Sequence, residues 1–112
     1  MKTANENGVY EPDTCDELAR HGHSYAAVKI CQCDDGLFRY ALDLTYSYGG
    51  FGNPISHQSE GFPTRRAAKD AATEELLRRF PAPWASEPRS VHEELAVMKA
   101  QIEYTLNQPS LF

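Results

Sequence analysis

The sequence predicts an α+β protein with the element order α-β-β-β-α, followed by a further helix and a short C-terminal tail. Three observations carry this prediction. Two stretches after Tyr25 alternate apolar and polar residues, as strands do. Two later stretches carry apolar residues at helical spacing, and a proline-rich stretch separates them. We therefore expect a three-stranded antiparallel sheet packed on helices.

Length and composition limit the chain to one folded unit. A chain of 112 residues can build one core, and its 41% hydrophobic and 24% charged residues are close to globular averages. No stretch approaches the roughly 18 apolar residues of a membrane span, and the first residues lack the apolar core of a signal peptide. Three cysteines are too few to staple a secreted domain, which favours the cytoplasm.

The N-terminal end, residues 1–12, is polar and has no apolar periodicity, so we expect a loose arm. The module itself is expected to span residues 13–80. Thr14 and Glu17 have the spacing of a capping box, and Gly22 suits the left-handed end of a helix. These features predict a short helix over about Cys15 to His21.

The next segment predicts a hairpin of two strands. Val28 and Ile30 alternate with their neighbours, and Asp35-Gly36 suits a tight turn that needs a positive φ at glycine. Large apolar side chains then occupy every second position: Phe38, Tyr40, Leu42, Leu44, Tyr46 and Tyr48. We expect this strand to face the core, although its tyrosines would form a base-stacking platform if they were exposed.

A glycine-rich turn over residues 49–54 is expected to lead into a short third strand over residues 55–59. Thr64 is placed to cap the helix that follows. The apolar residues of that helix recur at helical spacing: Ala68, Ala71, Ala72, Leu76 and Phe80. Pro81 is expected to stop it.

Residues 81–89 contain three prolines and predict a semi-rigid linker. Ser90 and Glu93 have the spacing of a second capping box, which predicts an amphipathic helix over residues 90–107. Its apolar stripe consists of Val91, Leu95, Met98, Ile102 and Leu106. This stripe can pack in one of two ways: against the sheet of the same chain, or against a second copy of the chain in a homodimer.

The helix that begins at Thr64 opens with the sequence Thr-Arg-Arg-Ala-Ala-Lys-Asp-Ala-Ala. This opening and the α-β-β-β-α order resemble the double-stranded-RNA-binding domain, whose last helix carries basic residues that contact phosphates. The resemblance assigns nucleic-acid binding to Arg65, Arg66 and Lys69. A helix N-terminus also favours an anion.

Two features of this chain differ from the usual pattern of that family. The loop between the first two strands enters a groove in the family, whereas here it is short and acidic. The formal net charge of −5 also repels phosphates, so nucleic-acid binding requires a local basic face.

The tail over residues 108–112 reads Gln-Pro-Ser-Leu-Phe and resembles the peptide with which bacterial replication and repair proteins dock on the sliding clamp. The resemblance assigns polar contacts with the clamp to Gln108, and it assigns the filling of an apolar pocket to Leu111 and Phe112. Pro109 departs from the usual leucine but pre-orders an extended peptide. The alternative is that Leu111 and Phe112 fold back on the domain or on a partner subunit.

No cofactor, metal or catalytic residue is predicted. The possible zinc ligands lack zinc spacing: Cys15, His21, His23, Cys31 and Cys33. No local motif joins His57, Asp43 and Glu60 into a catalytic set.

The sequence therefore predicts a non-enzymatic accessory protein of nucleic-acid metabolism, which binds nucleic acid or a replication protein and docks on the sliding clamp. The alternative is an acidic protein-interaction or inhibitory module, monomeric or dimeric, without nucleic-acid contact.

Overall fold

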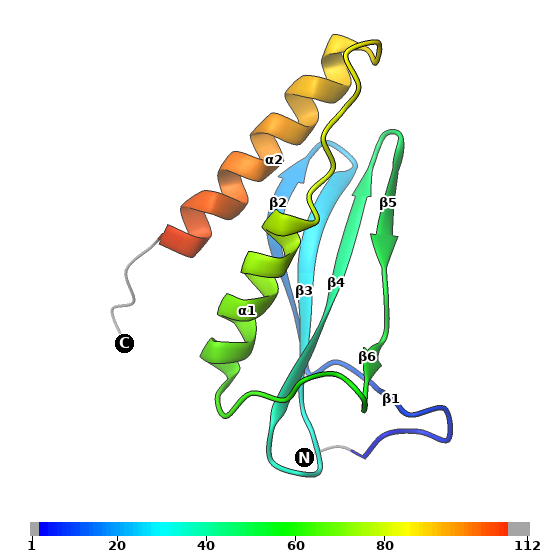
Figure 1. Cartoon of the computed structure of the whole chain (residues 1–112), viewed down its shortest axis with the longest axis vertical. Helices are drawn as coiled ribbons and strands as arrows, with labels where there is room; N and C mark the ends of the chain where they lie inside the picture. Colours follow the sequence, from blue (N-terminus) through cyan, green and yellow to red (C-terminus); the bar gives the residue numbers. More distant parts are fainter. Residues whose placement is uncertain (1–2, 108–112) are drawn as a thin grey trace.

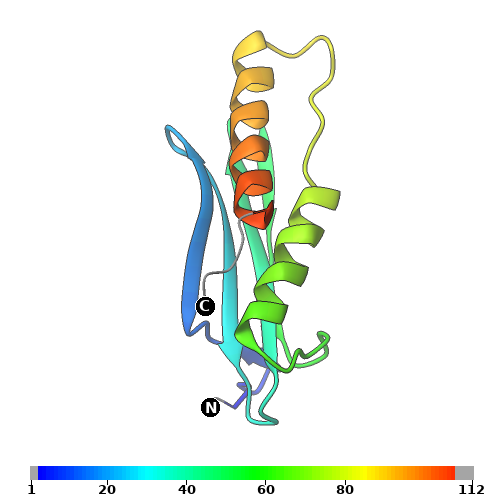
Figure 2. The ribbon, with the colours of Figure 1, turned by 90° about the vertical axis from the view of Figure 1, so that its left-hand side faces the viewer.

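The computed structural model describes residues 3–107 and consists of a four-stranded antiparallel sheet with two helices on one face (Figures 1 and 2). The strand order is β2-β3-β4-β5, and a separate two-stranded sheet pairs β1 with β6. The strands are β1 (Val9–Tyr10), β2 (Thr14–His21), β3 (Ser24–Gln32), β4 (Phe38–Tyr46), β5 (Gly49–Gly52) and β6 (Ile55–Ser56). An α+β fold with an antiparallel sheet packed on helices is confirmed, but the sheet has four strands instead of three.

The predicted hairpin is confirmed as β3 and β4, and these two strands form the centre of the sheet. Val28 lies opposite Leu42 in its register. Gly36 adopts a φ of 86° in the turn between these strands, which confirms the positive φ predicted for the glycine of Asp35-Gly36. Gly22, with a φ of 63°, also lies in a turn, but that turn joins β2 to β3.

The predicted helix over Cys15 to His21 is wrong, because these residues form strand β2 and pair with β3. The register shifts between Glu17 and Ala19, so two consecutive side chains, Leu18 and Ala19, are buried. Such a bulge interrupts the alternation that identifies a strand in a sequence. Glu17 accepts a hydrogen bond from the Arg20 side chain instead of completing a capping box.

Two further predictions about the strands need correction. The glycine-rich segment contains strand β5, which pairs with β4 from Asp43 to Tyr46. The third predicted strand, residues 55–59, is reduced to β6, which pairs with β1 and not with the main sheet. Residues 3–12 are consequently part of the fold, since Tyr10 of β1 is buried, and the predicted loose arm is wrong there.

Helix α1 spans Arg65–Arg78, and Thr64 caps it by accepting a hydrogen bond from the Ala67 amide at 3.0 Å, as predicted. Helix α2 spans Arg89–Asn107, one residue earlier than expected. The amide of Val91 donates to the carbonyl of Pro88, which places Ser90 inside the first turn instead of at the cap. Residues 81–88 between the helices contain no helix or strand.

One main core joins the sheet to both helices. The stripe of α2 packs within its own chain, because Val91, Leu95, Met98 and Ile102 belong to the same buried cluster as Val28 of the sheet. The other face of the sheet carries a second, smaller core formed by Tyr10, Cys31, Cys33, Ala41 and Ile55. Helices therefore pack on the sheet as expected. Both of them come after the strands in the sequence, whereas one helix was expected before the strands.

Candidate functional site

The basic residues predicted to contact nucleic acid lie at the N-terminal end of α1, where all three have acidic partners. The Arg65 guanidinium donates to the Thr14 hydroxyl at 2.9 Å, lies 3.8 Å from Asp13 and covers the Phe38 ring at 5.2 Å. Arg65 therefore connects α1 to the start of β2 and to β4. A phosphate would have to compete with these contacts.

The other two basic residues are also paired. Arg66 forms an ion pair with Asp70 one helical turn later, at 3.2 Å. Lys69 lies 3.6 Å from Asp16 of β2. The structure thus brings the three predicted residues together at one end of α1, and the same place holds carboxylates that neutralise them.

A pocket of about 480 Å³ lies between α1 and the outer edge of β4. Helix α1 contributes one wall, and the segment between β5 and α1 contributes the other. Its lining residues are Tyr40, Leu42, Asn53, Ser59, Glu60, Phe62, Ala71, Glu74, Glu75 and Arg78. The volume lies in the range of small-ligand sites, roughly 300–1,000 Å³.

The floor of this pocket is held by a hydrogen bond between sheet and helix. The Tyr40 hydroxyl donates to the Glu75 carboxylate at 2.5 Å, and Arg79 donates to the other oxygen of Glu75 at 3.1 Å. The bond from Tyr40, followed by that from Arg79, lowers the pKa of Glu75 against the opposing effect of burial. Burial and the same bond raise the pKa of Tyr40. Glu75 is therefore ionised and engaged at neutral pH.

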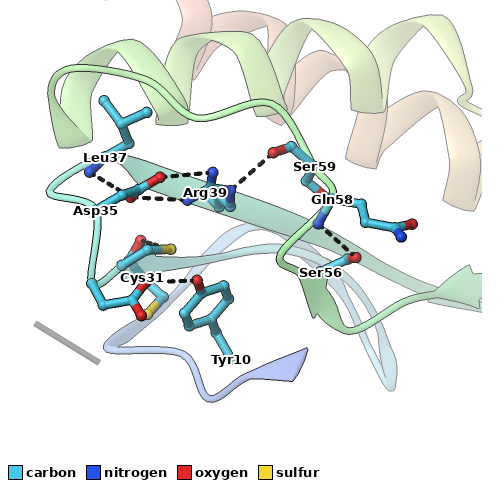
Figure 3. A network of polar contacts seen from close by, with 10 residues as sticks. Tyr10, Cys31, Asp35, Leu37, Arg39, Ser56, Gln58 and Ser59 are labelled. Atoms are coloured by element: carbon cyan, nitrogen blue, oxygen red, sulfur yellow. Dashed lines mark hydrogen bonds and ion pairs between the residues drawn. The ribbon is translucent and has the colours of Figure 1, made fainter. Parts of the chain in front are cut away.

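The opposite face of the sheet holds a polar network around Arg39 (Figure 3). The Arg39 guanidinium donates to both Asp35 oxygens, at 3.1 and 2.9 Å, and its Nε donates to the Ser59 carbonyl at 2.9 Å. The bonds from Arg39 hold the pKa of Asp35 below its usual value. This network ties the β3–β4 turn to the segment before α1.

Tyr10 and two cysteines lie next to this network. The Tyr10 hydroxyl donates to Asp34 at 3.0 Å; burial and, next, this bond raise the pKa of Tyr10 to about 12. The side chains of Cys31 and Cys33 are fully buried, whereas Cys15 is exposed on β2. Their surroundings are those of a small packed core.

A buried carboxylate joins α2 to the opposite end of the sheet. Glu94 is only 4% exposed and accepts hydrogen bonds from the hydroxyls of Ser24 and Ser47 and from the Ser47 amide. Ser24 begins β3, and Ser47 follows β4. Each of these polar groups is satisfied inside the fold, which makes Glu94 a structural link between helix and sheet.

The residues weighed for catalysis lie in separate surroundings. His57 contacts the Gly8 carbonyl at 3.0 Å, and Asp43 accepts from the Tyr25 hydroxyl at 3.2 Å. Of His57, Asp43 and Glu60, only Glu60 lines the pocket. Across residues 3–107, no three His, Cys, Asp or Glu side chains gather in a group that could hold a metal ion.

Residues Gln108, Leu111 and Phe112, which were assigned to partner binding, lie outside the described residues. The pocket, by contrast, was not predicted, because its residues come from strand β4, the segment between β5 and α1, and helix α1, which share no local motif. Its only sequence signal is the run Glu74-Glu75 on one helix.

Comparisons with known proteins add no family to this description. No protein-family model, no curated protein and no solved structure matches the chain significantly. Neither described helix has the length and the apolar character that crossing a membrane requires.

Proposed function

We propose that this chain is a non-enzymatic protein-interaction module whose folded part does not contact nucleic acid. One observation carries this proposal: the cations of the predicted nucleic-acid face are paired with carboxylates. Asp13 lies beside Arg65, Asp16 beside Lys69 and Asp70 beside Arg66. The net charge of −5 supports the same reading, since the whole molecule repels a polyanion.

A phosphate that bound at this end of α1 would have to displace these carboxylates from their cations. An exposed ion pair contributes only about 0–1 kcal/mol, so a phosphate could displace it. Displacement would leave Asp13, Asp16 and Asp70 within a few ångströms of the phosphates, and the repulsion between like charges would oppose binding. The paired arrangement therefore favours partners other than nucleic acid.

Fluorescence anisotropy with labelled duplex RNA tests this proposal. The duplex should exceed the ~16 base pairs that one double-stranded-RNA-binding domain spans. We expect no binding by the intact chain at low salt. Binding that disappears in the Arg65→Ala/Arg66→Ala variant would overturn the proposal.

A gain-of-function variant tests whether the paired carboxylates prevent RNA binding. Asp16→Asn and Asp70→Asn together leave Lys69 and Arg66 without their partners, so we expect the double variant to acquire weak, salt-sensitive RNA binding. Glu87→Gln/Glu103→Gln makes the same change in net charge away from α1 and serves as the control. Equal RNA binding by both double variants would mean that net charge alone, and not the pairing at α1, determines whether the protein binds RNA.

We also propose the bacterial sliding clamp as a partner, because the tail carries the residues of a clamp-binding peptide. Gln108 supplies the polar contact, and Leu111 and Phe112 supply the apolar ones. The amphipathic stripe of α2 is occupied by the chain's own core, so the helix itself has little apolar surface left to offer. The tail, and not α2, is therefore the segment that we propose docks on a replication partner.

A pull-down with purified clamp tests this second proposal. The intact chain should be retained, whereas a chain lacking residues 108–112 and the Leu111→Ala/Phe112→Ala variant should both be lost. Ser110→Ala is the matched control, since no role is assigned to that hydroxyl. Equal retention of the intact and shortened chains would exclude docking through the tail.

A further inference from the structure

The outer edge of β4 has a gap one residue wide. On one side, Phe38 and Phe62 exchange two backbone hydrogen bonds of 2.8 Å. On the other side, Leu42 donates to the side-chain oxygen of Asn53 at 3.3 Å and accepts from the Asn53 amide at 3.4 Å. Because alternate residues of a strand direct their backbone groups to the same edge, the amide and carbonyl of Tyr40 point into the gap.

The gap exists because the chain leaves this edge after β5. Pro54 has no amide hydrogen to continue the pairing, and the following residues form β6, which pairs with β1 in the second sheet. The chain returns to β4 only at Phe62. Within residues 3–107, the backbone of Tyr40 has no strand partner on this side, and Tyr40 is one of the residues that line the pocket.

The pocket combines aromatic surface with acidic groups at its rim. The rings of Tyr40 and Phe62 lie 5.9 Å apart at 33°. Glu60 and Glu74 are exposed lining residues, and neither has an ion-pair partner in the described part of the chain. Glu75 is not available to a ligand, because Tyr40 and Arg79 already engage it.

We propose that this pocket receives one arginine side chain from a basic protein partner, an inference that rests on the proposed protein-interaction function. A guanidinium stacks on aromatic rings and presents a planar set of donors to carboxylates and carbonyl groups. Glu60 and Glu74 accept its hydrogen bonds, and the rings of Tyr40 and Phe62 receive its plane and stem. Arg78 also lines the pocket, so Glu60, Glu74 and Arg78 together carry a net charge of −1, which one arginine side chain neutralises.

Lysine fits this arrangement less well. Its ammonium group is a compact, strongly hydrated charge that neither stacks on a ring nor bridges two carboxylates in one plane. A neutral side chain of the same shape leaves the two carboxylates without a counter-charge. The order of affinity expected for the pocket is therefore arginine, then lysine, then citrulline.

An NMR titration of the full ¹⁵N-labelled chain tests this order. The probes are three blocked tripeptides with glycine on both sides of arginine, lysine or citrulline. The arginine peptide should shift the amides of Tyr40, Phe62 and Glu74 in a saturable way. We expect the lysine peptide to bind about tenfold more weakly and the citrulline peptide to cause no saturable shift.

Matched variants test whether the arginine peptide binds in this pocket. Glu60→Gln and Glu74→Gln should each weaken binding of the arginine peptide about fivefold to tenfold, since each removes one charged acceptor. Glu103→Gln on α2 has the same charge change away from the pocket and should bind like the unaltered chain. Equal shifts with the citrulline peptide, or unchanged affinity in both pocket variants, would overturn the inference.

The titration separates this inference from the function on which it rests. Duplex RNA binding through Arg65 and Arg66, together with arginine binding at Glu74, would reject the proposed function and keep the pocket. Absence of both RNA binding and arginine binding would reject the pocket and leave the protein-interaction module in place.

Discussion

At the scale of single residues, the bond between Tyr40 and Glu75 links stability to pH. Because the folded-state pKa of Glu75 lies below its ordinary value of 4.5, its ionisation stabilises the fold above about pH 4.5. This contribution is lost as the pH falls through the lowered pKa. Tyr40 supplies the largest cause of the shift, so its hydroxyl should control how strongly acid destabilises the protein.

The variant Tyr40→Phe tests this link. We expect it to lose about 1 kcal/mol of unfolding free energy near neutral pH, because one hydrogen bond to a carboxylate disappears. It should then lose less further stability on acidification than the unaltered chain. Urea unfolding at several pH values measures both effects. Tyr46→Phe is the control, since its hydroxyl makes no hydrogen bond within residues 3–107, and an unchanged acid sensitivity of Tyr40→Phe would contradict the assignment.

At the scale of elements, Glu94 fixes α2 to the sheet. The change Glu94→Ala leaves the hydroxyls of Ser24 and Ser47 and the Ser47 amide without their acceptor. We expect a loss of about 2–3 kcal/mol in unfolding free energy, typical of losing charged hydrogen bonds at a buried site. Chemical denaturation followed by circular dichroism measures this loss.

The neighbouring residue provides the control for this experiment. Glu93 is exposed and forms an ion pair with Arg89 at 3.2 Å. Because exposed pairs contribute little, Glu93→Ala should change the unfolding free energy by less than about 0.5 kcal/mol. Similar losses in the two variants would mean that helix propensity, and not the buried contacts of Glu94, determines the effect.

The elements that were predicted correctly are those whose signals are local. The alternation around Leu42 defines β4, and Thr64 with the alanines after it defines α1. Strand β2 was missed because its bulge places Leu18 and Ala19 on the buried side in succession. Strand β5 was missed because Gly49 and Gly50 carry no side chain that could reveal an alternating pattern.

The candidate site depended on long-range contacts that the sequence does not reveal. The basic residues of α1 were recognised, but their pairing with Asp13 and Asp16 arises only when β2 lies beside the helix. The pocket depends on the departure of the chain at Pro54 and its return at Phe62. Neither these ion pairs nor this path of the chain can be predicted from the spacing of residues within one element.

At the scale of the whole molecule, the position of α2 leads to an expectation about oligomeric state. The stripe that could have paired with a second copy is buried on the chain's own sheet, since Met98 and Ile102 are fully covered. Among the large apolar residues of the described part of this helix, Val97 and Tyr104 remain exposed. We expect sedimentation equilibrium to give the mass of a monomer, 12.6 kDa, at micromolar concentrations.

A second copy bound through other surfaces would contradict this expectation. The variant Val97→Ser/Tyr104→Ser separates the two cases, because it removes the exposed apolar residues without touching the core. A dimer that this variant dissociates would place a self-association surface on the outer face of α2. A monomer in both samples would agree with packing of the stripe inside one chain.

The late position of α2 in the chain also sets the order of events during synthesis. Ribosomes add about 5–20 residues per second, so roughly 3 to 11 s separate the completion of β5 from that of α2. During this interval the sheet emerges with part of its apolar face uncovered. Nascent chains stalled before residue 89 should therefore be cleaved by proteases faster than chains whose α2 has left the ribosome.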